Sequence, residues 1–229
     1  AARVFRRPGE RPLMVLIHGY RGGNYRVEEK LWPVRWFLRR GVDVALFTLP
    51  FHGVRRKDTP FFTYDPRVTI ETLRQAIIDL RALLAAVRGR HKGVGVAGMS
   101  LGGYTTALLA TVEPLDLVCP FIPLGSFADS ARDSGWLNGS PAEQSIQYAA
   151  IERAYAAIDP FQRVPKAEPE RCVVIAGAGD RITPATQAER LAEHFKAECV
   201  RFPGGHLMQT GRKRGFLALE QRMVRAGWL

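Results

Sequence analysis

Cysteine, lysine and long apolar runs are all scarce in this sequence of 229 residues. Its three cysteines, Cys119, Cys172 and Cys199, are too few and too scattered for a disulfide-stapled secreted domain. We expect buried free thiols in a reducing compartment, which favours the cytoplasm. No stretch approaches the ~20 uninterrupted apolar residues of a membrane-spanning helix, so we expect no membrane span. The chain begins AARVFRR, without methionine or a signal-length apolar stretch, so trimming of a longer precursor is compatible with it.

Lysine supplies only six of the 33 basic side chains, and arginine supplies the other 27. The formal charge of +11 and the pI of about 10.1 would suit a nucleic-acid partner or an anionic membrane surface. The arginines are nevertheless spread through every segment, without the dense basic run of a binding tail. We therefore expect a solvated, arginine-rich surface and no nucleic-acid binding.

Six apolar runs rich in Val, Ile, Leu and Phe recur along the chain. Because they are nearly continuous rather than alternating, they predict strands buried on both faces of a parallel sheet. The runs span residues 12–20, 42–50, 94–100, 117–125, 172–179 and 198–204.

Segments with helical spacing lie between these runs and predict a doubly wound α/β fold of about six strands. The expected helices cover 68–89, 185–195 and 216–229, with Thr183 as the cap of the second. More than forty residues separate the runs at 117–125 and 172–179, more than a crossover needs. Within them Ser140 and Glu143 have capping-box spacing and predict a helix. We expect one domain over 1–229, with a small helical cap inserted at about 127–170.

One serine carries the pattern of a nucleophile. The stretch GMSLG places Ser100 after an apolar run and before a helical segment, with Gly98 and Gly102 two residues away on either side. Small residues are needed there because the sharp turn of a nucleophile elbow presses these positions together. The overlapping GVGVAG of residues 93–98 matches a dinucleotide fingerprint, but it forms the strand instead of following one, so we exclude nucleotide binding.

A serine hydroxyl needs a base and a group that orients the base. The histidines are His18, His52, His91, His194 and His206. We expect His206 to be the base, because it follows the last strand where two glycines let the chain turn over the sheet edge. Asp180, directly after the preceding strand, is the expected orienting acid, and Asp129 is the alternative.

The oxyanion of an acyl-transfer reaction needs hydrogen-bond donors. The backbone N–H of Leu101, at the start of the helix, is one expected donor. The N–H of Tyr20 in the loop HGYRGG is the other, because this loop follows an apolar run at the same sheet edge.

These residues together resemble the α/β-hydrolase superfamily. The resemblance rests on the order Ser100, Asp180, His206 after successive strands, with HGY upstream, and covers the chain from Leu13 onward. It implies a hydrolase of the carboxylic-ester type that works through an acyl-enzyme on a small acyl substrate. No His or Cys pair has the spacing of metal ligands, so we expect no metal and no other cofactor. Two departures stand out: the two strands that usually precede the HG loop are not evident, and HGYRGG replaces the HGGG of many lipases.

The same triad would also serve a thioesterase, an amidase or peptidase, or an acyltransferase, and the fold alone can serve a non-catalytic binding protein.

The expected substrate-binding residues are Arg21, Phe51, His52, Trp136 and Met208. The loop at 49–66 also combines Phe61, Phe62 and Tyr64 with Arg55, Arg56 and Lys57, which could receive an acyl chain and an anionic head group. Packing of these aromatic rings against the cap is the simpler interpretation and the one that we favour. The sequence leaves the oligomeric state open.

Overall fold

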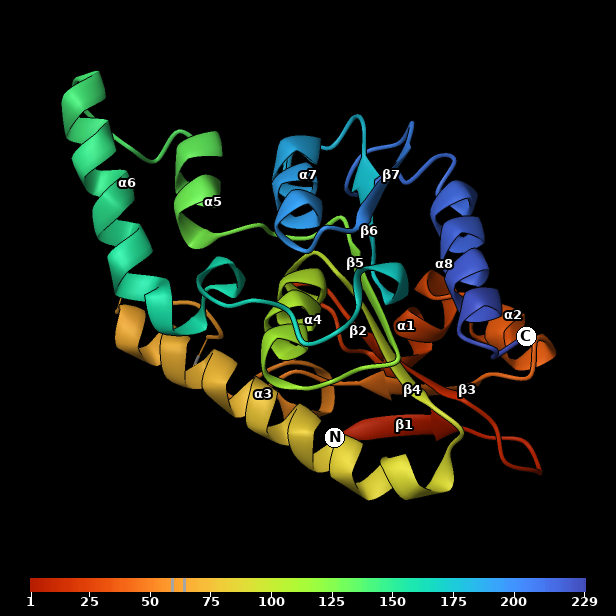
Figure 1. Ribbon diagram of the computed structural model, residues 1–229. Helices are drawn as coiled ribbons and strands as arrows, with labels where there is room; N and C mark the ends of the chain where they lie inside the picture. The colour runs from red at the N-terminus through yellow and green to blue at the C-terminus, as the bar shows by residue number, and fades with distance from the viewer. Residues whose placement is uncertain (59, 64) are drawn as a thin grey trace.

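A computed structural model describes residues 1–58, 60–63 and 65–229 (Figure 1). In this part of the chain seven strands form one sheet in the order β1-β3-β2-β4-β5-β6-β7. All neighbouring strands are parallel except β1, which runs antiparallel to β3. The strands are β1 (Ala2–Phe5), β2 (Leu13–Ile17), β3 (Asp43–Phe47), β4 (Val94–Met99), β5 (Leu117–Phe121), β6 (Val173–Gly177) and β7 (Glu198–Phe202). The expected mostly parallel sheet is confirmed.

The additional strand is β1, which was not expected from the sequence. It has only four residues, and Ala2 pairs with Phe47 while Phe5 pairs with Val44. Arg3 and Val4 are both exposed, as suits a short edge strand, so its sequence lacks a buried apolar run. One strand that usually precedes the HG loop is therefore present.

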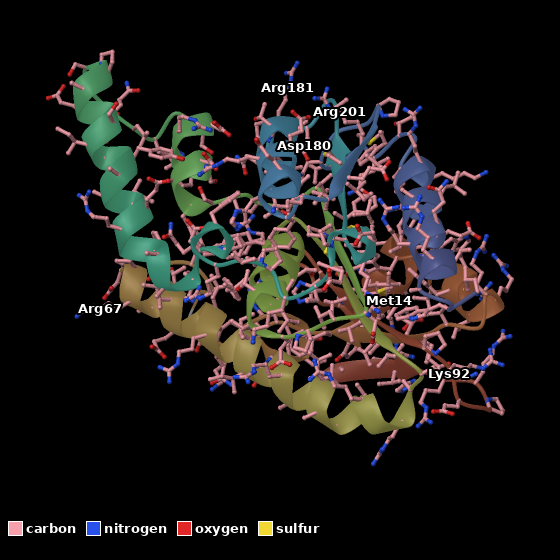
Figure 2. The ribbon with its side chains drawn as sticks, in the orientation of Figure 1. Met14, Arg67, Lys92, Asp180, Arg181 and Arg201 are labelled. Atoms are coloured by element: carbon pink, nitrogen blue, oxygen red, sulfur yellow. The ribbon has the colours of Figure 1, made fainter. Side chains whose placement is uncertain are left out.

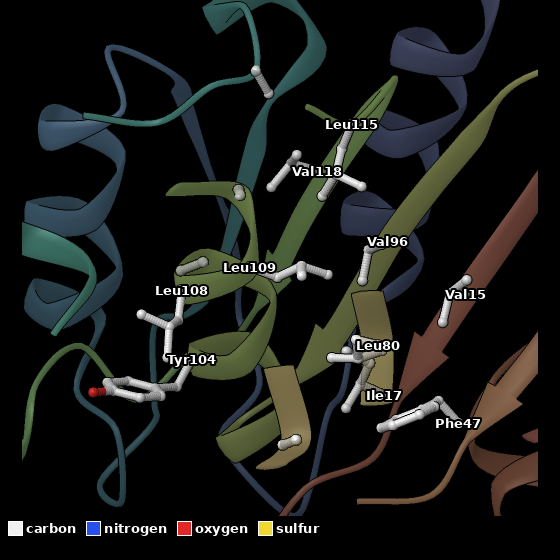
Figure 3. Close-up of a cluster of buried hydrophobic side chains, with 14 of the residues drawn as sticks. Val15, Ile17, Phe47, Leu80, Val96, Tyr104, Leu108, Leu109, Leu115 and Val118 are labelled. Carbon is white, nitrogen blue, oxygen red and sulfur yellow. The ribbon is translucent and has the colours of Figure 1, made fainter. Parts of the chain in front are cut away.

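Successive side chains of each central strand face opposite sides of the sheet, and helices cover both sides. Leu13, Val15 and Ile17 of β2 belong to one buried cluster, whereas Met14 and Leu16 belong to another. The first cluster lies against α3 (Pro66–Val87), α4 (Leu101–Val112) and α7 (Ala185–His194). The second lies against α2 (Val34–Arg39) and α8 (Lys213–Arg225). Figure 3 shows side chains of the first cluster between β2, β4 and the neighbouring helices. This arrangement confirms the doubly wound fold, and it explains the uninterrupted apolar runs.

The helices are α1 (Tyr25–Leu31), α2 (Val34–Arg39), α3 (Pro66–Val87), α4 (Leu101–Val112), α5 (Phe127–Asp133), α6 (Pro141–Tyr155), α7 (Ala185–His194) and α8 (Lys213–Arg225). Of these, α3, α7 and α8 lie on the expected segments to within four residues at each end, whereas α1 and α2 were not predicted from the sequence. Short 3-10 turns are η1 (Gly53–Arg55), η2 (Arg88–Arg90), η3 (Ala156–Ile158), η4 (Pro160–Gln162) and η5 (Pro169–Arg171). The capping box of Ser140 and Glu143 begins α6 as expected. Thr183 does not cap α7, because Pro184 is the N-cap residue and makes no side-chain capping bond.

The segment between β5 and β6 holds α5 and α6, and α6 projects well away from the sheet at the left of Figure 1. Asp129 of α5 joins these helices to α7. Its buried carboxylate accepts hydrogen bonds from the hydroxyl of Tyr148 at 2.8 Å and from Nη1 of Arg190 at 2.6 Å, and it contacts Arg132 at 3.0 Å. The carboxylate of Asp129 thus attaches the insertion to α7, and it forms no hydrogen bond with His206 in the described part of the chain.

The cysteines are free, as expected: Cys119 and Cys172 are buried and Cys199 is partly buried. Among the helices of the described residues, none is both long enough and apolar enough to span a bilayer.

Candidate active site

Ser100 occupies a strained turn between β4 and α4. Its φ of 54° and ψ of −115° place a residue with a side chain in a region that such residues rarely adopt. The turn is held by the amide of Ser100, which donates to the carbonyl of Phe121 at 3.0 Å. Such a conformation is stable only where its surroundings enforce it, and it directs Ser100 out of the line of the strand.

Gly98 and Gly102 have to be glycine at this turn. A Cβ atom built on Gly98 would collide with the carbonyl group of Gly102. A Cβ atom on Gly102 would collide with the carbonyl oxygen of Ile17, at the end of the neighbouring strand β2. The start of α4 therefore packs directly on β2, which agrees with the geometry expected from the sequence.

Asp180 and His206 lie in the loops after β6 and β7 and meet there. Nδ1 of His206 donates a hydrogen bond to Oδ2 of Asp180 at 2.8 Å, because an ionised carboxylate can only accept. This bond leaves Nε2 of His206 free for a proton. The side chain of Asp180 is completely buried, and that of His206 is 13% exposed. In Figure 2 Asp180 is labelled in this region, beside Arg181, which points away from the molecule.

Several polar groups surround the carboxylate of Asp180. Besides His206, the backbone amides of Ile182 and Thr183 each donate to Oδ1 at 2.9 Å, and Oγ1 of Thr183 lies 3.1 Å from Oδ2. Burial raises the pKa of the Asp180 carboxyl, but the bonds from His206 and the two amides outweigh burial and leave the pKa below its usual value.

Thr183, which was expected to cap the following helix, contacts Asp180 and His206 instead. Its Oγ1 lies 3.1 Å from Nδ1 of His206 and 3.2 Å from the carbonyl oxygen of Ile122, in addition to its contact with Asp180. The side chain is therefore turned toward Asp180 and His206 and away from the helix that follows. In the sequence, the only indication of this contact is that Thr183 follows Asp180 by three residues, directly after a predicted strand.

Ser100 and His206 line one cavity of about 670 Å³. Among the hydrogen bonds of the described residues there is none between their side chains, and such bonds commonly tighten only when substrate binds. The remaining lining residues are Gly19, Tyr20, Arg21, Gly22, Glu28, Leu31, Met99, Ile122, Ile182, Leu207, Gln209 and Arg212. Of these, Leu31, Ile182, Leu207 and Arg212 carried no signal in the sequence, since they reach the cavity only through the path of their loops and helices.

The loop HGYRGG lies directly against the serine. A Cβ atom built on Gly19 would lie 3.4 Å from Cβ of Ser100. The amide of Gly22 donates to the carbonyl of Gly19 at 3.0 Å, so Tyr20 and Arg21 occupy the centre of a tight turn, with Arg21 at a φ of 63°. The amide of Tyr20 has no hydrogen-bond acceptor within the described residues. Leu101 is the first residue of α4, where amides lack a partner inside the helix.

The structure brings only some of the expected substrate-binding residues to Ser100. Arg21 lines its cavity, whereas Phe51 and His52 line a neighbouring cavity of about 440 Å³. Trp136 and Met208 line neither, and their side chains are 70% and 78% exposed. Trp136 lies in the loop after α5, and Met208 turns outward although His206 turns inward.

The aromatic residues of the loop after β3 pack on one another and on the cap. Phe61 is buried against His52 and Phe62, and Phe62 in turn contacts Phe127 of α5 with ring centroids 5.7 Å apart. This is the packing interpretation favoured by the sequence. Tyr64, another aromatic residue of this loop, lies outside the described residues.

Metal ligands are not grouped in this structure: across residues 1–58, 60–63 and 65–229 there is no cluster of three or more His, Cys, Asp or Glu side chains suited to hold a metal ion.

Comparisons with known proteins agree with this architecture. A family model described as the alpha/beta hydrolase family matches residues 14–218. An uncharacterized protein of Mycobacterium tuberculosis is 30% identical over 237 residues; the match covers 96% of this chain but only 56% of the relative's length. The chain thus spans about half of that longer protein.

Two solved esterase structures share the fold at low identity. Est1E from Butyrivibrio proteoclasticus, solved with ferulic acid bound, superposes with a TM-score of 0.72 at 17% identity, covering 99% of this chain and 94% of its own. Acetyl xylan esterase 1 from Thermoanaerobacterium sp. JW/SL YS485 gives a TM-score of 0.68 at 17% identity, covering 98% and 78%. Because the family model covers most of the sequence, the chain belongs to the alpha/beta hydrolase family.

Proposed function

We propose that this protein is a serine hydrolase that cleaves a carboxylic ester through an acyl-enzyme. The observation that carries the proposal is the 2.8 Å hydrogen bond from His206 to Asp180 at a cavity that Ser100 also lines. A hydrogen-bonded acid and base beside a serine at an elbow are the parts that nucleophilic catalysis requires. The two similar esterase structures support the same reaction class.

In the proposed mechanism Oγ of Ser100 attacks the ester carbonyl while Nε2 of His206 accepts the hydroxyl proton. Asp180, ionised and hydrogen-bonded to Nδ1, stabilises the imidazolium that forms. The amides of Leu101 and Tyr20 donate to the oxyanion of the tetrahedral intermediate.

Collapse of this intermediate breaks the bond between the carbonyl carbon and the alcohol oxygen, and His206 returns its proton to the departing alcohol. Water then attacks the acyl-enzyme by the same sequence of proton transfers, which releases the acid and restores Ser100. The first covalent step is therefore independent of which nucleophile finally accepts the acyl group.

A fluorophosphonate probe followed by mass spectrometry tests the nucleophile. We expect one adduct on the peptide that contains Ser100, and none in Ser100→Ala. Ser145→Ala, an exposed serine of α6, is the matched control and should label like the wild type. Equal labelling of wild type and Ser100→Ala would overturn the proposal, as would no labelling of the folded wild type.

A substrate panel then tests the reaction. We expect hydrolysis of p-nitrophenyl esters with kcat/KM above that for matched thioesters and aminoacyl amides. A higher value for thioesters or amides, or acyl transfer to an added alcohol in place of hydrolysis, would retain Ser100 as nucleophile and replace the ester assignment. Labelling without turnover of any substrate would favour a binding protein.

A further inference from the structure

Three cavities meet at the turn formed by Gly19, Tyr20, Arg21 and Gly22. The cavity of Ser100 and the neighbouring cavity of about 440 Å³ share Tyr20, Arg21 and Gly22. A third cavity of about 600 Å³ also contains Arg21 and Gly22. The surface beside the serine therefore continues over Arg21 onto the loop that follows β3.

Unpaired cations gather along this continuation. Arg21 lines all three cavities, and Arg56 lines the second and the third. Lys57 adds a charge to the second cavity and Arg26 adds one to the third. None of these four side chains forms an ion pair with an acidic side chain of the described residues, whereas fourteen ion pairs between arginine and an acidic side chain occur elsewhere.

The adjacent residues Arg55 and Arg56 have different tasks. Nη2 of Arg55 pairs with Asp79 of α3 at 2.6 Å, and its Nη1 donates to the carbonyl of Thr48 at 3.1 Å. Arg55 thus fastens the loop to the body of the protein. Arg56 has no such partner and lies exposed on the cavity wall. Because its guanidinium has no acidic partner, Arg56 is available to bind an anion from outside the chain.

The two loops that carry Arg21 and Arg56 are in direct contact. A Cβ atom on Gly53 would collide with the carbonyl group of Gly23, so the backbones touch at that point. Arg21 is fixed by its tight turn, and its guanidinium lies over the ring of Tyr20, 5.7 Å from the ring centroid. The backbones that carry the two arginines are therefore held against each other, beside the residue proposed to donate to the oxyanion.

Few acidic groups offset these charges. Asp58 lines the second cavity and is exposed, and Glu28 lines the cavity of Ser100 but is buried. Oε1 of Glu28 accepts a hydrogen bond from the amide of Gly23 at 2.9 Å, which directs this carboxyl at the loop backbone. With four cations against the exposed Asp58, this wall carries a positive charge.

We propose that Arg21 and Arg56 form a binding site for an anionic group of the substrate, a phosphate or a carboxylate, on the part of the ester that extends from Ser100 past Tyr20. Arginine suits either anion because its planar guanidinium donates two parallel hydrogen bonds. The inference rests on the proposed function and adds the substrate class: an ester that carries a negative charge.

Four aryl esters test this site. Phenyl acetate is neutral; phenyl hydrogen succinate carries a carboxylate in its acyl half; 4-acetoxybenzoate and 4-acetoxyphenyl phosphate carry a carboxylate or a phosphate in the leaving group. The ratio of kcat/KM between wild type and variant is taken for each ester separately, so that differences in intrinsic reactivity cancel.

The variants are Arg21→Asn, Arg56→Ala and the double variant, with Arg35→Ala as control. Asparagine is chosen because it tolerates the left-handed conformation of Arg21. Arg35 is exposed on α2, unpaired, and lines none of the three cavities. For at least one anionic ester we expect a loss of about 5- to 20-fold for each single variant and no more than twofold for phenyl acetate. Which ester loses most distinguishes phosphate from carboxylate.

Ionic strength provides a second readout. Because both arginines are exposed, 0.5 M NaCl should lower the wild-type kcat/KM for the anionic ester toward that of the double variant. The same salt should change kcat/KM of the double variant little. Equal losses on neutral and anionic esters, or losses that Arg35→Ala reproduces, would overturn the anion site while leaving the ester hydrolase intact. Failure of wild type to hydrolyse any of the four esters would instead count against the proposed function.

Discussion

The amide of Leu49 donates a hydrogen bond to Nε2 of the His18 imidazole at 3.1 Å, and so joins the end of β3 to the loop that lies against Ser100. On the other side of the ring, Nδ1 lies 2.7 Å from the carbonyl oxygen of Gly19. A carbonyl can only accept and an amide N–H can only donate, so His18 is neutral with its proton on Nδ1. The histidine of the HG motif is thus a buried structural link.

Stability should therefore depend on the titration of His18. Burial lowers the pKa of His18 from 6.5 to about 4. Between pH 6.5 and 4 the unfolded chain binds a proton at His18 that the folded chain does not, so the free energy of unfolding falls as the pH falls through this window. The difference in pKa corresponds to roughly 3 kcal/mol. Below about pH 4 this contribution levels off.

Urea unfolding of wild type and His18→Gln between pH 7.5 and 4 measures this contribution. Wild type should be the more stable at pH 7.5, and the difference in the free energy of unfolding should narrow by up to about 3 kcal/mol toward pH 4. His194→Gln is the control, because Nε2 of His194 contacts only the carbonyl of Arg163 near the surface. A difference between wild type and His18→Gln that stays constant with pH would contradict the expectation.

Replacing the two candidate acids should separate catalysis from stability. Asp180→Asn removes the charge that would stabilise the His206 imidazolium, and we expect kcat to fall about 10³- to 10⁴-fold with little change in Tm. Asp129→Asn weakens the links to Arg190 and Arg132, so we expect about 2 kcal/mol less stability, with kcat within threefold of wild type. Ester hydrolysis and thermal unfolding of both variants check this. The reverse pattern would make Asp129 the orienting acid.

Thr183 should affect catalysis through the two side chains that it contacts. Thr183→Val keeps the shape but removes the hydroxyl that lies 3.1 Å from both Asp180 and His206. We expect kcat/KM to fall about tenfold, mostly in kcat, because the pair is then held less firmly. Thr183→Ser keeps the hydroxyl and should restore at least half of the wild-type value. If serine rescues no better than valine, Thr183 contributes through packing alone.

The sequence predicted those parts of the site that follow directly from parallel strands. Ser100, Asp180 and His206 each come after a strand, and the carboxyl ends of parallel strands share one edge, so their placement at that edge could be expected before the structure. The contacts of Gly98 and Gly102 follow in the same way from the elbow pattern. The missed strand β1 is short, exposed and charged at Arg3, and thus lacks the buried pattern on which strand prediction depends.

Residues placed by the course of loops could not be predicted in this way. Trp136 and Met208 are close in sequence to expected functional segments, yet both are exposed. The backbone of a loop has no regular repeat, so the direction of its side chains cannot be predicted as it can in a helix or strand. The different tasks of Arg55 and Arg56 depend on Asp79, which is more than twenty residues away on α3. Likewise, Arg212 reaches the cavity only because α8 packs against the far strands.

A last prediction concerns the contact of α4 with β2. Gly102→Ala would drive Cβ into the carbonyl oxygen of Ile17, which is backbone and cannot rotate away. The start of α4 would have to move from β2, and with it the amide of Leu101. We expect a loss of about 2 to 4 kcal/mol in the free energy of unfolding, with much slower labelling of Ser100 by a fluorophosphonate in the molecules that remain folded.

Gly89→Ala in η2 is the matched control, since a Cβ atom there meets nothing within 4 Å and the backbone has no positive φ. It should stay within about 0.5 kcal/mol of wild type and label at the wild-type rate. Should Gly102→Ala instead match Gly89→Ala in both readouts, α4 would be able to shift on β2 at little cost. The strained conformation of Ser100 would then be maintained by its own bond to Phe121 and not by the packing of the helix behind it.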